Sequence, residues 1–387
     1  MGNNDKRPKI RFKGFNDDWE QHKVSKEVYS VDTGKSKYNI LEIGKYEILG
    51  STGIIGYDDS YDYEGDFLLT ARVGANAGTL YRHSGKVKIT DNTVFLQGNH
   101  IDFVFYLLDK FDLKKLSFGS GQPLIKASEL KAIELYIPKN SEEKNKITKY
   151  FISIDKLISL HQRKLEKLGN IKKSMLEKMF PKDENKVPEI RFKGFNDDWE
   201  QRKLIEYLAV SKVKNKDEAY NKDDVLSVSG DYGIVNQIEF QGRSFAGASV
   251  TNYGVVATGD VVYTKSPLKS NPYGIIKTNK GKTGIVSTLY AVYKPLENTY
   301  PEFVQIYFEQ DARMNNYMHP LVNKGAKNDM KVSDENALKG DVIFPQKEEQ
   351  IKISEYFLRL DNLISLHQRK LEKLKNIKKA CLEKMFV

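Results

Sequence analysis

The chain has 387 residues, 40% of them hydrophobic, with a formal net charge of +10 and a single cysteine, Cys381. This composition excludes a disordered chain and an internal disulfide, and the sequence contains no run of 18 apolar residues that could span a membrane. We therefore expect a cytoplasmic protein of two or three folded domains, whose basic charge suits nucleic acid or an acidic protein surface.

The first element in chain order is a short box, "IRFKGFNDDWEQ", at residues 10–21, and the same twelve letters return at residues 190–201. A verbatim repeat of this length indicates an internally duplicated protein. Identical sequences make identical contacts, so the box cannot distinguish two different targets. We expect its aromatic side chains to anchor each half of the chain on a common support; these side chains are Phe12, Phe15 and Trp19, with Phe192, Phe195 and Trp199.

Two variable regions, 24–140 and 204–346, follow the two boxes. Short alternating runs such as "KVKITDNTVFLQ" and "TGIVSTLYAVY" are broken by Gly, Asn and Pro, which is typical of β-rich structure with irregular loops. The regions share a faint skeleton, seen in "EGDFLLTAR" and "TGDVVYTKS", but differ at most other positions. Any discrimination between two targets must lie in these regions.

Each half closes with a long helical segment. "LISLHQRKLEKLGNIKKSMLEKMF" at residues 157–180 returns at residues 363–386 with 21 of 24 positions identical. Apolar residues recur at alternating steps of three and four, which predicts a coiled-coil seam, with Lys172 as the one polar break in the first copy. Two such helices most economically pack on each other, and we expect His161 and His367, at equivalent seam positions, to have a packing role.

The excess charge lies mostly on these helices. Residues 142–180 hold ten Lys or Arg and five Asp or Glu, and residues 348–386 hold nine and six, so together they carry +8 of the formal +10. The variable regions are nearly neutral. The basic charge therefore suits a partner protein or a solvated helix face better than it marks a DNA contact.

The boxes, the helix start "KEEQIKI" and the helix "LISLHQRKLEKLKNIKK" resemble the specificity subunit of type I restriction-modification enzymes, and the resemblance extends over essentially the whole chain. It implies an α+β fold in which two mixed, mostly β target-recognition domains are separated by two long helices packed as an antiparallel coiled coil, with a pseudo-twofold internal repeat. The first half departs from the family pattern at "SEEKNKI", where Lys144 replaces the usual Gln. The predicted boundaries are 1–141 for the first recognition domain, 142–180 for the central helix, 181–347 for a linker with the second recognition domain, and 348–387 for the distal helix.

The same resemblance implies function and partners. Each recognition domain would read one half of an asymmetric, bipartite double-stranded DNA site. The helices would set the spacing and dock two adenine-N6 methyltransferase subunits, joined by restriction and translocase subunits in the full complex. S-adenosylmethionine, ATP and Mg would belong to those partners, and this chain would be non-catalytic, without a cofactor or metal of its own.

Candidate DNA contacts are polar side chains on loops of the variable regions, because the donors of Arg, Lys, Asn and Gln match the edges of bases in the major groove. In the first region they are Ser51, Thr52, Arg72, Asn76, Gln122 and Lys126. In the second region they are Ser229, Tyr232, Lys265, Lys269, Asn271, Lys324, Lys327, Asn328 and Lys331.

Three other functions remain open from the residues alone: a stand-alone bipartite DNA-binding regulator, a protein scaffold with duplicated adaptor domains, and a nuclease. The nuclease is the least favoured, because no cluster of metal-binding carboxylates with a partnering lysine stands out. The six histidines show no metal-ligand spacing with one another or with the cysteine. No catalytic constellation is visible in the sequence.

Overall fold

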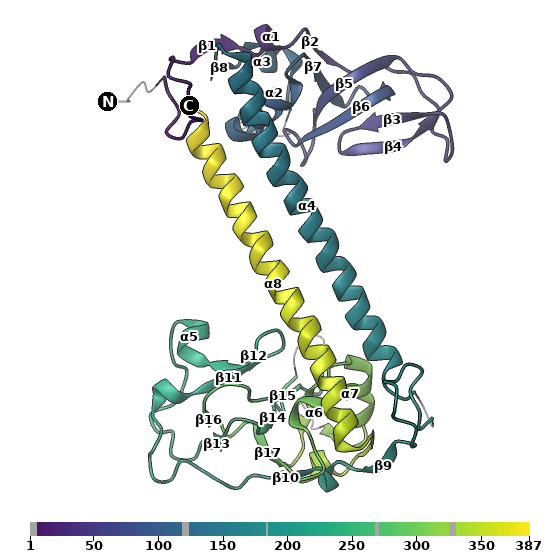
Figure 1. Cartoon of the computed structure of the whole chain (residues 1–387), viewed down its shortest axis with the longest axis vertical. Coiled ribbons are helices and arrows are strands. Elements are labelled where there is room, and N and C mark those ends of the chain that lie inside the picture. Colours follow the sequence, from purple (N-terminus) through teal and green to yellow (C-terminus); the bar gives the residue numbers. More distant parts are fainter. Residues whose placement is uncertain (1–5, 118–123, 183–184, 268–270, 325–329) are drawn as a thin grey trace. The chain divides into compact units, whose positions relative to one another are not determined.

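The computed structural model describes residues 6–117, 124–182, 185–267, 271–324 and 330–387. The chain divides into a first unit, residues 1–163 with 368–387, and a second unit, residues 164–367. Each unit combines one β-rich domain with part of each long helix. The two helices are the teal α4, Ser141–Lys178, and the yellow α8, Lys347–Met385, in Figure 1.

The domain of the first unit is built on a six-stranded sheet in the order β2-β7-β5-β6-β3-β4, in which only the β3–β6 pair is parallel. A separate antiparallel pair joins β1, which ends the box, to β8, which precedes α4. The strands are β1 Glu20–Lys23, β2 Ser30–Thr33, β3 Tyr46–Gly50, β4 Gly53–Asp58, β5 Tyr63–Ala71, β6 Leu80–Ile89, β7 Thr93–Gln97 and β8 Glu134–Ile137. The helices are α1 Val24–Glu27, α2 Ile101–Phe111, α3 Ala127–Ala132 and the 3-10 turn Leu113–Ser117.

The domain of the second unit has a four-stranded sheet in the order β10-β17-β14-β15 and small pairs β11-β12, β13-β16 and β18-β19. Here β9, which ends the second box, pairs with β20, which precedes α8. The strands are β9 Glu200–Lys203, β10 Leu208–Val210, β11 Leu226–Ser229, β12 Gly233–Asn236, β13 Gly254–Val256, β14 Val261–Tyr263, β15 Ile276–Thr278, β16 Gly284–Val286, β17 Ala291–Pro295, β18 Asn323–Lys324, β19 Met330–Lys331 and β20 Asp341–Phe344. The helices are α5 Gln237–Gln241, α6 Pro301–Tyr307, α7 Asp311–Met318 and the 3-10 turns Leu204–Glu206, Lys222–Asp224 and Asn336–Leu338.

The two domains share a frame of four strands. The order β2-β7-β5-β6 in the first unit corresponds to β10-β17-β14-β15 in the second, and the related stretches "DFLLT" and "DVVYT" fall on β5 and around β14. They differ in what is inserted. The first domain adds β3 and β4 to the sheet, whereas the second inserts β11, β12, α5 and β13 before the corresponding strand. The predicted mixed, mostly β domains with an internal repeat are confirmed.

Helix α4 begins at Ser141 and α8 at Lys347, each one residue before the boundary expected from the sequence. The Asn140 side chain accepts a hydrogen bond from the Glu142 amide at 2.8 Å, which caps the first turn of α4. Helix α4 ends at Lys178, two residues before the predicted end, and continues unbroken through Gly169.

The helices pack on each other within each unit. In the first unit Phe151 of α4 lies against Phe386, just after α8, with ring centroids 5.8 Å apart. In the second unit Phe180, just after α4, lies against Phe357 of α8 at 6.2 Å. The start of one helix thus meets the end of the other, so the predicted antiparallel pairing is confirmed.

Candidate nucleic-acid interface

The repeated box is the support of each domain, and its tryptophan is buried in both units. Trp19 packs edge-on against Phe386 with ring centroids 6.1 Å apart, and Trp199 packs in the same way against Phe180 at 6.0 Å. Both indoles are 1% exposed. Since Phe180 and Phe386 follow the identical letters "LEKM", the same box docks on the same sequence twice.

A second contact of the box is a buried ion pair with the start of a long helix. The Arg11 guanidinium donates to Glu143 through Nε at 2.6 Å and Nη2 at 2.8 Å, and Arg191 donates to Glu349 at 2.7 and 2.8 Å. Both carboxylates are 1% exposed. Planar two-point pairs of this kind fix orientation as well as position. The box therefore joins the end of one long helix to the beginning of the other.

The other predicted anchor residues lie around these contacts. Phe12 packs edge-on against Tyr150, and Phe192 against Tyr356, both with centroids 6.1 Å apart. The Lys146 ammonium lies 4.9 Å from the ring of Phe15. Of the remaining predicted residues, Phe195 and His161 are half-buried and His367 is buried.

Two candidate residues of the first domain, Ser51 and Arg72, contact the same turn, residues 90–92. The Ser51 hydroxyl lies 3.3 Å from the Asn92 carbonyl, which also accepts the Arg72 amide at 2.9 Å. The Arg72 guanidinium reaches the Asp91 carbonyl at 3.4 Å. In turn, the Arg72 carbonyl accepts the amide of Ile125 at 2.7 Å, which brings the start of α3 to the same place.

These contacts bring the β3–β4 turn and the loop after β5 to the 90–92 turn, with the start of α3 beside Arg72. Thr52 lies in the β3–β4 turn beside Ser51, exposed Asn76 lies in the β5–β6 loop, and exposed Lys126 precedes α3. Gln122 falls outside the described residues. Exposed Asp91 and Asn92 belong to this surface but were missed by the sequence analysis. The Asp-Asn turn between two alternating runs is the signal that could have found them.

Candidates of the second domain fall on separate elements. Ser229 ends β11, and its hydroxyl accepts the amide of Tyr232, whose side chain is 70% exposed. Lys265 forms an ion pair with Asp334 at 2.7 Å, and the Asn271 amide donates to Asp311 at 2.6 Å. These acids offset part of the positive potential that a phosphate would meet. In the β18–β19 pair Lys324 lies opposite Met330, and Lys331 lies opposite Asn323, the residue before Lys324. Lys269, Lys327 and Asn328 lie outside the described residues.

An exposed aromatic group lies beside Tyr232 and was not predicted. The Tyr232 ring is 5.3 Å from Phe240, and the Arg243 guanidinium lies 4.6 Å from the ring of Phe245. Phe240 is 43% and Phe245 55% exposed. An arginine among aromatic residues in the polar stretch "FQGRSF" is the sequence signal for this group.

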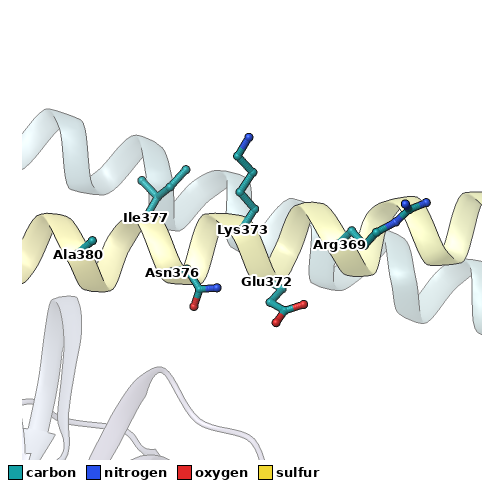
Figure 2. A pocket seen from close by; sticks show the side chains of 6 residues that line it. All are labelled: Arg369, Glu372, Lys373, Asn376, Ile377 and Ala380. Atoms are coloured by element: carbon teal, nitrogen blue, oxygen red, sulfur yellow. The ribbon is translucent and has the colours of Figure 1, made fainter. Parts of the chain in front are cut away.

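Helix α8 carries a surface hollow in the first unit. Figure 2 shows its six lining side chains along the same stretch of the helix: Arg369, Glu372, Lys373, Asn376, Ile377 and Ala380. Five of the six residues recur 206 positions earlier in α4, and only Ala380 is replaced, by Ser174. The sequence therefore offers this face twice.

Within the ranges that the structure describes, no group of three His, Cys, Asp or Glu residues could hold a metal ion. Nor is any described helix long and apolar enough to cross a membrane.

Residues 16–170 match the family model described as "Type I restriction modification DNA specificity domain". The S subunit of the type I restriction-modification system from M. genitalium aligns with a TM-score of 0.66 and 16% identity, over 98% of this chain and 99% of that one. The HsdS subunit from Thermoanaerobacter tengcongensis aligns with a TM-score of 0.41 and 13% identity, over 95% and 96%. The family match covers residues 16–170, less than half of this chain, and agrees with the predicted resemblance over that part. The M. genitalium structure shows the same fold over 98% of this chain.

Proposed function

We propose that this chain, which carries the type I restriction-modification DNA specificity domain in its first half, reads a bipartite, asymmetric double-stranded DNA site with one recognition domain for each half. One observation carries the proposal. Two domains with the same four-strand frame and the same box carry different insertions and loops. Such a molecule can present two different reading surfaces on identical supports.

The polar loops supply the chemistry of reading. In the first domain Ser51, Arg72 and Asn76 offer hydroxyl, guanidinium and amide groups beside the 90–92 turn. Forked donors of this kind distinguish base pairs in the major groove, while neighbouring contacts to phosphates position the protein. In the second domain Ser229, Tyr232, Lys265 and Asn271 have this role, together with Lys324, Lys331 and the candidates outside the described residues.

The repeated helices suit two copies of one partner. The lining of the α8 hollow recurs almost unchanged in α4, and the two helical segments carry most of the positive charge. Identical surfaces bind identical partners, and we assign them to two adenine-N6 methyltransferase subunits, with restriction and translocase subunits joining in the full complex. S-adenosylmethionine, ATP and Mg would act in those subunits. The assembly would act on DNA in the cytoplasm.

Exchange of one variable region tests the proposal. Residues 24–140 are replaced by the corresponding region of another specificity subunit, and methyladenine is mapped across the genome of cells that also express the methyltransferase partner. We expect one half of the methylated motif to change while the other half and the gap stay as they were. A change in both halves, or in neither, would contradict the assignment of one half to each domain.

A gel shift separates this function from a stand-alone DNA-binding regulator. We expect tight, specific binding of the bipartite site only when the methyltransferase subunits are present. Equal specific affinity without them would favour the regulator, and binding that does not weaken with salt would favour the scaffold.

A further inference from the structure

Arg82 and Lys277 occupy the same position of the shared frame. Arg82 on β6 is the register partner of Leu68 on β5, and Lys277 on β15 is the register partner of Val262 on β14. Leu68 and Val262 are themselves equivalent in "DFLLT" and "DVVYT". The two domains differ at most other positions, yet both have a cationic side chain at this equivalent position.

Each of these two strands directly follows a segment of the chain that contains candidate DNA contacts. Strand β6 follows the loop with Arg72 and Asn76, and β15 follows the segment with Lys265 and Asn271. A shift of either strand would therefore move the donors that precede it.

In the first unit Arg82 reaches a charged cluster that includes both long helices. Its guanidinium lies 2.7 Å from Asp102 of α2 and 3.7 Å from Asp155 of α4. Asp155 also pairs with Lys378 of α8 at 2.9 Å and accepts the hydroxyl of Tyr106 at 2.7 Å. Arg82 therefore links β6 to this cluster.

The second unit repeats the cluster with the helices exchanged. Lys172 of α4 pairs with Asp361 of α8 at 2.7 Å and with Glu309, close to the end of α6, at 2.7 Å. Asp361 and Lys378 lie 206 positions after Asp155 and Lys172, which is the offset of the helical repeat. The polar break predicted at Lys172 is thus half of a repeated ion pair.

Lys277 is the counterpart of Arg82 in this second cluster. It is 8% exposed and interacts electrostatically with Glu309, Asp361 and Lys172. Burial lowers the pKa of Lys277 and Lys172 adds to this effect, while the two carboxylates oppose it. The Glu309 Oε2 atom is buried and has no hydrogen-bond partner within the described ranges. No hydrogen bond or ion pair joins Lys277 to Glu309 or Asp361 among the described residues, so the attraction of these two carboxylates acts across a longer distance than the Arg82 contacts of the first unit.

We propose that Arg82 and Lys277 are equivalent positioning residues, each of which ties the strand leaving its DNA-reading segment to the paired helices and so keeps that half-site in register. The inference rests on the proposed function. Neither residue needs to touch DNA, because its effect passes through the segment that precedes it. A role in stability alone would lower unfolding temperature without changing which base pairs are preferred.

The test uses the full chain with its methyltransferase partner and four variants: Arg82→Met, Arg82→Lys, Lys277→Met and Lys277→Arg. Affinity is measured for the bipartite site and for sites in which either half is replaced. We expect Arg82→Met to reduce discrimination at the half read by the first domain by about tenfold, the scale of a lost charged hydrogen bond, with the other half unchanged. Lys277→Met should reduce discrimination at the other half instead, by a smaller factor because it removes a charge without a direct hydrogen bond. Arg82→Lys should keep most of the discrimination, since the second domain uses lysine there.

Unchanged discrimination in both Met variants, or an equal loss at both halves, would overturn the inference. If Arg82→Met fails to fold, Asp155→Asn removes the shared charge at nearly the same volume and must reproduce the selective loss. If the unmodified complex itself shows no sequence preference, the proposed function fails instead, so the two failures are distinguishable.

Discussion

The two units differ least where they meet the helices and most where they would meet DNA. At the box the tryptophan contacts agree within 0.1 Å, at 6.1 and 6.0 Å, and the arginine pairs are equally similar. Away from it, the four-strand frame persists while its insertions change from a β3–β4 hairpin to the β11–β12 hairpin with α5. The box that supports each domain has kept its sequence, and the surface that we propose to select the target has not.

Removal of the buried indoles one at a time should have the largest effect and tests whether the two boxes are equivalent. Trp19→Ala and Trp199→Ala should each destabilise their own unit by about 3–5 kcal/mol, because each leaves a cavity against a phenylalanine ring. Amide hydrogen exchange should show the loss confined to the first unit for Trp19→Ala and to the second for Trp199→Ala. Trp19→Phe serves as the milder control. Unequal losses in the two units would show that the identical boxes do not have identical roles.

The buried arginine pairs give the next largest effect. Arg11→Met leaves the Glu143 carboxylate buried without its partner, and we expect a loss of about 2–3 kcal/mol, with Arg191→Met equivalent through Glu349. Chemical denaturation followed by hydrogen exchange measures each unit. The double variant Arg11→Met with Glu143→Gln should recover part of the loss, because no unpaired charge remains. Failure to recover would mean that packing of the arginine stem matters more than the pair.

Measurements of DNA affinity test the divergent loops of the two domains. Arg72→Ala should weaken binding at one half-site by roughly 1–2 kcal/mol, within the range for a lost base contact. Lys265→Ala should cost less at the other half, since that ammonium is already paired with Asp334 at 2.7 Å. Competition binding with half-substituted sites measures both, and exposed Lys13 in the box provides a matched control, Lys13→Ala, with little effect expected. A loss at both halves from Arg72→Ala would contradict its assignment to one domain.

The sequence predicts the elements well but not their long-range partners. The seam periodicity and the Glu pairs predict both helices, and the alternating runs predict the mostly β domains. However, the letters "LEKMF" end both helical repeats, so sequence cannot say whether Trp19 meets Phe180 or Phe386. The structure selects Phe386, more than 360 positions away.

Prediction of the candidate DNA contacts is limited for a related reason. Ser51, Arg72 and Lys126 are far apart in the sequence. Only the hydrogen bonds of the folded chain show that Ser51 and Arg72 meet at the 90–92 turn and that Ile125, next to Lys126, bonds to Arg72. Lys265 looks like a free cation in "TKSPLKS", but its partner Asp334 lies 69 positions later. Side-chain type is readable from sequence, whereas pairing between distant loops depends on the folded sheet.

The smallest expected effect concerns the one helix position at which the repeats differ by a glycine. Gly169 lies inside α4, its backbone is helical, and a Cβ atom there would meet nothing within 4 Å. Gly169→Ala should therefore stabilise the chain by up to about 1 kcal/mol, because glycine loses more backbone entropy in a helix. The reciprocal change at the equivalent position, Lys375→Gly, should destabilise it by a similar amount, and thermal unfolding measures both. If Gly169→Ala is instead destabilising, or weakens assembly with the methyltransferase subunits, the glycine has a role that its repeat partner Lys375 lacks, and the two helices are not interchangeable supports.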